Sequence, residues 1–185
     1  MHFDKNNSVF RSLERITKRL DGIGVAYAIC GGMALFQHGY RRFTEDVDLL
    51  VTRESLQLIH EKLEGLGYLP PFAGSKNLRD TDTGVKIEFL VTGDYPGDGL
   101  PKPVAFPDPK DVVEMIDGIP CLRLSTLIEL KLTSGMAAWR LKDLADVQEM
   151  IRVLNLPLEM SEQLNPYIAQ SYRDQWVAVH AAPIE

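Results

Sequence analysis

The segment from residue 30 to residue 51 constrains the fold more than any other part of the chain. It ends in the hexapeptide DVDLLV of residues 46–51, which begins with the alternation of polar and apolar side chains typical of a half-buried β-strand. Asp46 and Asp48 then share one face, about 7 Å apart. Two carboxylates this close repel each other unless a cation lies between them. The pattern predicts a strand with an acidic face that suits Mg²⁺ or Mn²⁺, which prefer oxygen ligands.

A glycine pair precedes this strand. Gly31 and Gly32 follow an apolar run, residues 25–30, that predicts a buried strand, and they open a predicted helix over residues 33–38. Backbone without a Cβ can approach a phosphate closely, and the N–H groups at a helix start favour anions. Either motif alone is weak, because solvated aspartates on edge strands and glycine turns are both common. Their occurrence in one short segment favours a site for phosphate and metal.

The remaining hydrophobic periodicities predict mixed strands and helices first and helices alone afterwards. The further elements expected are helices over 7–22 and 54–66, hairpins over 78–91 and 112–124, a loop over 93–109, and C-terminal helices over 125–134, 141–154 and 160–179. We therefore predict an α/β (α+β) core with a mixed sheet flanked by helices over residues 1–124. A C-terminal helical part over residues 125–185 is expected to pack on this core.

The order of glycine pair, short spacer and acidic strand resembles the signature of the polymerase-β-like nucleotidyltransferase superfamily. It is similar to the small bacterial branch that includes AbiEii-type toxins and aminoglycoside or lincosamide nucleotidyltransferases. The resemblance covers residues 25–91 and, more loosely, residues 122–155. The positions that carry it are Gly31, Gly32, Gly39, Arg42, Thr44 and residues 46–51. It implies a nucleotidyltransferase-like core, phosphate contacts from the glycine pair and Arg42, and a role for Thr44 in shaping the loop before the acidic strand.

The resemblance also implies a third carboxylate on a later strand. In residues 85–91 the apolar side chains alternate with others, and Glu88 lies on the face opposite the apolar row. By resemblance, Glu88 either completes the metal site of the two strand aspartates or takes the proton from the acceptor hydroxyl. Asp80 and Asp82 are nearby alternatives, but they lie in the predicted turn, where aspartates commonly serve turn geometry.

A second cluster of charged residues lies in the C-terminal part. Lys131 stands within the apolar stripe of the first C-terminal helix, so its ammonium group must either reach solvent or meet an anion. The segment from Arg140 to Asp146 resembles the tail motif of the AbiEii-like branch, in which the lysine and the charged helix approach the triphosphate. The resemblance assigns Lys131, Arg140 and Asp143 to the nucleotide. For Asp146, a solvated pair with Lys142 is expected.

These assignments lead to one predicted function and one alternative. The chain is predicted to move a nucleoside monophosphate from an NTP to a hydroxyl group of a small molecule or a tRNA, with release of pyrophosphate. Mg²⁺ or Mn²⁺ would be held by Asp46, Asp48 and Glu88. The alternative is a non-catalytic nucleotide-binding module with the same fold, or a module that pairs with an antitoxin. The presence of all three carboxylates favours the enzyme, because it argues against decay of the metal site.

Composition narrows the acceptor and the cellular setting. The formal net charge is −6, and no basic stripe of the kind that grips long nucleic acids stands out. This balance favours a small acceptor and leaves a tRNA end open. Cys30 and Cys121 have no metal-ligand spacing and are expected to be buried free thiols. No apolar run approaches the roughly 18 residues of a membrane span, and the first residues form no apolar signal core. We therefore expect a soluble cytoplasmic protein.

Overall fold

A seven-stranded mixed sheet forms the centre of the molecule. The computed structural model describes residues 7–181, and the strand order is β3-β4-β5-β2-β1-β7-β6. The strands are β1 (Tyr27–Ile29), β2 (Asp46–Val51), β3 (Tyr68–Leu69), β4 (Leu78–Asp80), β5 (Lys86–Val91), β6 (Val113–Ile116) and β7 (Ile119–Leu122). The helices are α1 (Ser8–Ile23), α2 (Gly31–Gln37), α3 (Arg53–Leu63), α4 (Pro109–Val112), α5 (Leu124–Gly135), α6 (Leu141–Val153), the 3₁₀ helix η1 (Leu158–Gln163) and α7 (Pro166–Ala181). The predicted class, a mixed sheet flanked by helices, is confirmed.

Parallel pairing of β2 with β5 places the acidic residues of the two strands side by side. Asp48 lies opposite Glu88, and Asp46 lies opposite Lys86. On its other edge β2 pairs antiparallel with β1, so its register is held from both sides. Both predicted hairpins are confirmed, since β4 pairs antiparallel with β5 and β6 pairs antiparallel with β7.

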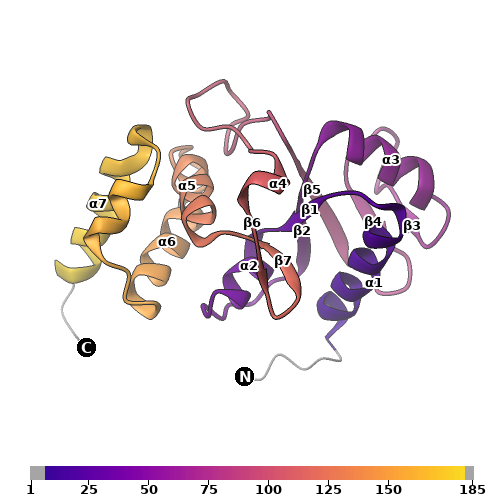
Figure 1. Ribbon diagram of the computed structural model, residues 1–185, viewed down its shortest axis with the longest axis horizontal. Helices are drawn as coiled ribbons and strands as arrows, with labels where there is room; N and C mark the ends of the chain where they lie inside the picture. Colours follow the sequence, from indigo (N-terminus) through magenta and orange to yellow (C-terminus); the bar gives the residue numbers. More distant parts are fainter. Residues whose placement is uncertain (1–6, 182–185) are drawn as a thin grey trace.

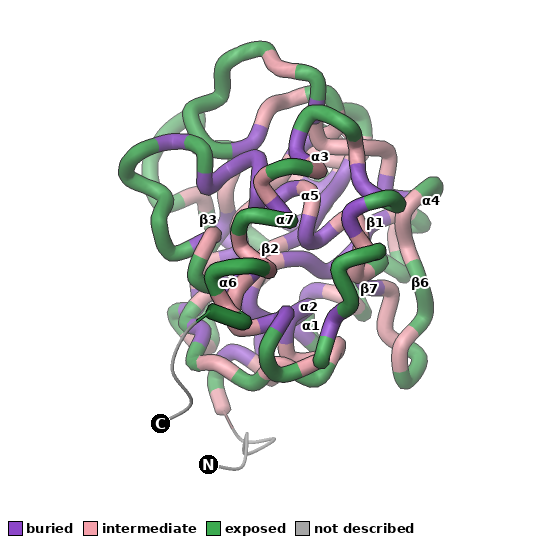
Figure 2. Tube along the Cα trace, turned by 90° about the vertical axis from the view of Figure 1, so that its left-hand side faces the viewer, coloured by how far each residue is buried: buried purple, intermediate pink, exposed green. Residues whose placement is uncertain are grey.

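Helices pack around this sheet in two groups. Helices α1 and α3 pack against each other at one end of the molecule, while α5, α6 and α7 stand together at the other end (Figure 1). The short α2 packs against β2 and β7. Buried residues concentrate along the central strands, and exposed ones lie on the outer helices and loops (Figure 2). Leu49 and Phe89, for example, are fully buried, and burial of each side chain contributes about 2 kcal/mol to stability.

Local sequence explains where helix α1 begins and ends and where α7 begins. The Asn7 side chain accepts a hydrogen bond from the Val9 N–H at 3.0 Å, and Gly24 ends α1 with a φ of 70°. The single helix predicted over residues 160–179 is wrong, because η1 and α7 replace it. Pro166 has no N–H to continue a helix and disfavours helical backbone in the residue before it, so a new helix starts there.

Two short elements were not predicted, and some predictions stay untested. The two-residue strand β3 and the four-residue helix α4 are too short to give a hydrophobic period. The division of the chain at residue 124 stays a prediction, and its outer ends, residues 1–6 and 182–185, lie outside the described residues. Within residues 7–181, none of the helices combines the length and the apolar character that a bilayer crossing requires.

Candidate active site

The three predicted acids share one face of the paired strands β2 and β5. Val47 and Ile87 are fully buried on the opposite face, whereas Asp46, Asp48 and Glu88 are only partly buried. The alternation predicted from the sequence is therefore confirmed. Asp48 and Glu88 line one cavity on this side of the sheet, and Asp46 lines a separate pocket.

The carboxyl groups on this face repel one another. Burial, followed by repulsion from Glu88, raises the pKa of Asp48 to about 6. Burial and Glu88 also raise the pKa of Asp46. Glu88 itself forms an ion pair with Lys86, and the hydrogen bond between them raises the lysine pKa. A divalent cation would relieve the repulsion between the aspartates, so their oxygen chemistry and their charge fit such an ion.

The third acid is not gathered with the aspartates into a ready ligand set. Among residues 7–181, no group of three or more His, Cys, Asp or Glu side chains lies close enough together to hold a metal ion. Glu88 directs a carboxylate oxygen to Lys86 instead. Asp46 and Asp48 are therefore the residues that best fit a metal, and a ligand role for Glu88 stays a prediction.

The glycine pair allows α2 to begin directly against the acidic strand. A Cβ on Gly31, whose φ is +56°, would lie 1.8 Å from Asp48 Oδ2, and a Cβ on Gly32 would lie 2.7 Å from Thr44 Oγ1. The Cys30 N–H donates to the Asp48 carbonyl at 3.0 Å, which fastens this turn to β2. The pair is therefore required by close packing on Asp48 and Thr44, and the predicted phosphate contact is compatible with that packing.

The buried Lys131 resolves one alternative left open by the sequence. Its Nζ donates to Asp143 Oδ1 at 3.0 Å and to Asp146 Oδ2 at 2.7 Å, so it meets anions and does not reach out to solvent. The solvated Lys142–Asp146 pair predicted from the sequence is wrong, because Asp146 is only 3% exposed. Helix α6 packs on α5 and turns Asp146 inward to meet Lys131.

Arg42 reaches the same cluster from the loop before β2. Its Nε lies 3.3 Å from Asp146 Oδ1. That nitrogen is buried, and no described residue offers it a well-oriented hydrogen bond. A guanidinium with an unused donor suits an oxyanion, because arginine donors match phosphate geometry.

Asp143 organises the other side of the cluster. It accepts hydrogen bonds from Ser134 Oγ at 2.7 Å and from Arg140 Nε at 2.8 Å, in addition to Lys131. Burial by itself would raise the Asp143 pKa, but Lys131, Ser134 and Arg140 outweigh it and lower the pKa. A carboxylate so fully engaged is suited to positioning the cations, not to direct contact with a phosphate. Sequence reasoning missed Ser134, whose only signal was its place one helical turn after Lys131.

One cavity of about 490 Å³ brings most of the predicted site residues together. Those that line it are Gly31, Arg42, Asp48, Glu88, Lys131, Arg140 and Asp143. The loop predicted over residues 93–109 supplies Tyr95, Pro96 and Phe106 to the cavity wall. Nothing in the local pattern of that loop indicated that it turns toward the acidic strands.

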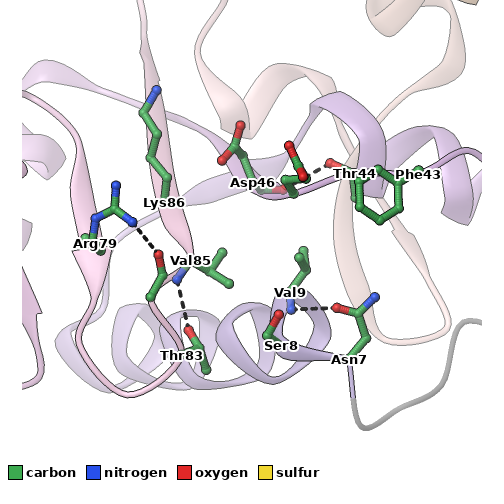
Figure 3. Close-up of a pocket in the computed structure, with 12 residues that line it drawn as sticks. Asn7, Ser8, Val9, Phe43, Thr44, Asp46, Arg79, Thr83, Val85 and Lys86 are labelled. Carbon is green, nitrogen blue, oxygen red and sulfur yellow. Dashed lines mark hydrogen bonds between the residues drawn. The ribbon is translucent and has the colours of Figure 1, made fainter.

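A second pocket has a volume of about 460 Å³. It is lined by Asp46 and Thr44, which are absent from the lining of the cavity. Figure 3 shows Asp46 at its centre, with Arg79 and Lys86 on one side and the start of α1 below. The two aspartates of β2 thus line different hollows, Asp46 the pocket and Asp48 the cavity.

Asp80 and Asp82 lie apart from this face, as expected for turn residues. The fully buried Asp80 accepts a hydrogen bond from Ser12 Oγ at 2.9 Å and lies 3.3 Å from Arg15 Nε. Asp82 pairs with Arg11 at 2.9 Å. Asp80, at the end of β4, and Asp82, in the turn that follows, therefore fasten α1 to this part of the sheet.

Comparison with known proteins identifies the fold. No protein-family model matches the chain, and no curated protein matches it significantly. Among solved structures, ANT(2'')-Ia in complex with adenylyl-2''-tobramycin has a TM-score of 0.51 and 13% identity, and the match covers 92% of this chain and 98% of that one. The chain has the nucleotidyltransferase fold.

Two other matches have nucleotidyltransferase descriptions. A candidate nucleotidyltransferase from Thermotoga maritima is 20% identical, with a TM-score of 0.48 and coverage of 78% of this chain and 91% of that one. An antigenic nucleotidyltransferase-like protein from Paracoccidioides brasiliensis is 16% identical, with a TM-score of 0.49 and coverage of 95% and 94%. Such low identities concern the nucleotidyltransferase fold alone, so the roles of individual residues rest on the geometry of the site.

Proposed function

We propose that the chain is a metal-dependent nucleotidyltransferase that moves a nucleoside monophosphate from an NTP to an acceptor hydroxyl and releases pyrophosphate. The observation that carries the proposal is the composition of the cavity. Asp48 lines the cavity, and the neighbouring Asp46 repels it. The cationic side chains of Arg42, Lys131 and Arg140 also line the cavity. A divalent cation and a polyphosphate together satisfy both halves of this charge pattern.

Each residue then has a defined task. Asp46 and Asp48 would hold Mg²⁺ or Mn²⁺, which supplies charge neutralisation to the phosphates when bound. The backbone at Gly31 and Gly32 admits the phosphates close to Asp48. The positive charges of Arg42, Lys131 and Arg140 face the β- and γ-phosphates, while Thr44 holds the approach to β2 through a 3.2 Å hydrogen bond to the Asp46 carbonyl.

The transfer step follows from this placement. The acceptor oxygen forms a bond to the α-phosphorus, the bond from that phosphorus to the bridging oxygen breaks, and pyrophosphate leaves with the electron pair. Glu88 accepts the hydroxyl proton, and Asp143 keeps Lys131 and Arg140 in place. Most of the rate enhancement would come from positioning and preorganised charge.

We propose a small hydroxylated molecule as the acceptor. The net charge of −6 disfavours a long nucleic acid, because phosphate contacts require a basic surface. The similar fold of ANT(2'')-Ia, solved with adenylyl-2''-tobramycin, supports an acceptor of this size. A tRNA end is the competing acceptor and is distinguished by the same assay.

The test is transfer of label from each of the four α-labelled NTPs with Mg²⁺ or Mn²⁺, in the presence of an aminoglycoside panel or total tRNA. We expect labelled product with the wild type and a loss of at least about 1,000-fold in the Asp46→Asn/Asp48→Asn variant. Asp174→Asn on exposed α7 is the matched control and should keep full activity. Transfer at the normal rate by the double variant would refute the assignment.

A further inference from the structure

Trp139 is an exposed tryptophan at the mouth of the cavity. Its side chain is 73% exposed, yet it is part of the cavity lining. It lies in the connection between α5 and α6, directly before Arg140. With this exposure the indole is not part of the hydrophobic core. A large aromatic surface beside a charged cavity is suited to stacking against a flat part of a ligand.

The backbone around Trp139 is held firmly. The Ala137 N–H donates to the Ser134 carbonyl at 3.1 Å, and the Arg140 N–H donates to the Ala137 carbonyl at 2.8 Å. The Arg140 side chain is fixed to Asp143. The indole is therefore mounted on a short, hydrogen-bonded turn, which lowers the entropy cost of binding a flat ligand.

The loop after β5 forms another part of the cavity wall. Tyr95 and Phe106 line the same cavity. At Gly97 a Cβ would lie 2.8 Å from the Ser134 carbonyl oxygen, so this loop packs directly on the end of α5, where the turn that carries Trp139 begins. The cavity lining thus combines charged side chains with aromatic ones. The close packing of Gly97 on Ser134 holds the loop against α5.

A ligand that satisfies both parts is polyanionic at one end and flat and aromatic at the other. We propose that Trp139 is the platform on which the nucleobase of the NTP stacks, while the triphosphate lies against Lys131 and Arg42. The inference rests on the proposed function of the cavity as a nucleotide site. Stacking on an indole uses the π-face that every base has, so all four NTPs bind, and the larger purines bind more tightly.

The test compares a nucleotide with a ligand that has phosphates and no base. MgATP and magnesium tripolyphosphate are titrated by calorimetry into the wild type, Trp139→Ala, Trp139→Phe and Leu141→Ala. We expect Trp139→Ala to raise the Kd for MgATP about tenfold and Trp139→Phe to raise it less. Both variants should bind tripolyphosphate as the wild type does. Leu141, 67% exposed and outside the cavity lining, is the matched control and should show wild-type affinity for both.

Three results would overturn the inference. If Trp139→Ala binds MgATP with wild-type affinity, Trp139 does not stack on the nucleobase. An equal loss of MgATP and tripolyphosphate affinity places Trp139 in the phosphate site or in folding. If the wild type binds neither ligand, the proposed function fails as well, whereas the first two results leave it intact.

Discussion

Two groups of aspartates in the same region of the molecule have opposite electrostatic surroundings. On β2, burial and repulsion from Glu88 raise the pKa of Asp48 to about 6. On α6, burial opposes ionisation of Asp143 as well, yet Lys131 and the neighbouring donors outweigh it and lower the Asp143 pKa. The difference therefore lies in the partners of each carboxylate and not in burial itself.

The comparison separates a supporting role from a ligand-binding role. Asp143 and Asp146 both pair with Lys131 within the chain. Ionisation of Asp48 costs stability in the folded chain, and a bound cation would offset this cost. A carboxylate that stays partly unsatisfied in the folded chain is the one available to bind a ligand.

The largest expected effect is a loss of stability when Lys131, the cation shared by Asp143 and Asp146, is removed. Lys131→Met would leave Asp143 and Asp146 without their central cation, and loss of one partner from a buried ion cluster costs about 3–5 kcal/mol. Urea denaturation measures this change in the free energy of unfolding. Lys142→Met, at an exposed neighbouring lysine, is the control and should change stability by less than about 0.5 kcal/mol. A similar small change for Lys131→Met would show that the buried cluster contributes nothing.

The next effect concerns the packing that keeps Asp48 in place. Gly31→Ala forces a Cβ into the Asp48 carboxylate at a φ of +56°, so we expect a loss of about 2–3 kcal/mol together with loss of metal binding. Gly118→Ala, at a φ of +78° with no other atom of the described residues within 4 Å of its Cβ, isolates the backbone strain at about 1 kcal/mol. Equal costs at the two positions would show that contact with Asp48 is unimportant.

Substitution of Asp48 and substitution of Asp143 should change the stability of the protein in opposite directions. Because the folded pKa of Asp48 lies above its usual 3.8, ionisation costs stability as the pH rises through about 6. Without metal at pH 7.5, Asp48→Asn should therefore stabilise the protein by on the order of 2 kcal/mol. This gain should disappear below pH 4, where Asp48 becomes protonated in both the folded and the unfolded chain.

Asp143→Asn is the counterpart and should destabilise the protein at pH 7.5. Its folded pKa lies below the usual 3.8, so the contribution of the carboxylate is present above that value and is lost as the pH falls below it. Mg²⁺ should raise the melting temperature of the wild type and of Asp143→Asn, but not of Asp48→Asn. If both variants changed stability in the same direction, the contrast between the two groups would be lost.

The smallest expected effect on stability is at Arg140, which pairs with Asp143 at the protein surface. The Arg140 side chain is 51% exposed although it pairs with Asp143, so solvent screens the pair. Arg140→Gln should cost at most about 1 kcal/mol, and high salt should shrink this cost. Thermal melts at low and high salt measure it, and a loss as large as that of Lys131→Met would mean that Arg140 is a central member of the cluster.

Local pattern was enough for the acidic strand and its surroundings. The alternation over residues 46–51, the glycine turn before it and the alternation around Glu88 predicted which faces would be buried, and the structure agrees. The hairpins followed from their turn residues. These features succeed because side-chain direction in a strand repeats every two residues and turns depend on adjacent residues.

Such local patterns could not predict which side chains would pair with the charged residues. The sequence left Lys131 between solvent and an anion and placed Asp146 in solvent, but the packing of α6 on α5 buries both and joins them to Arg42. In the same way, the loop wall with Tyr95 and the position of Trp139 at the cavity mouth depend on segments far apart in the chain.

The sequence by itself determined the acidic face of β2, the glycine turn beside it and the class of fold, because these depend on residues close together in the chain. Only the tertiary structure decided which carboxylates are satisfied and which remain open to a ligand. That decision depends on the charges that packing brings within a few ångströms, and a helix periodicity shows which face is apolar without showing what will lie against it.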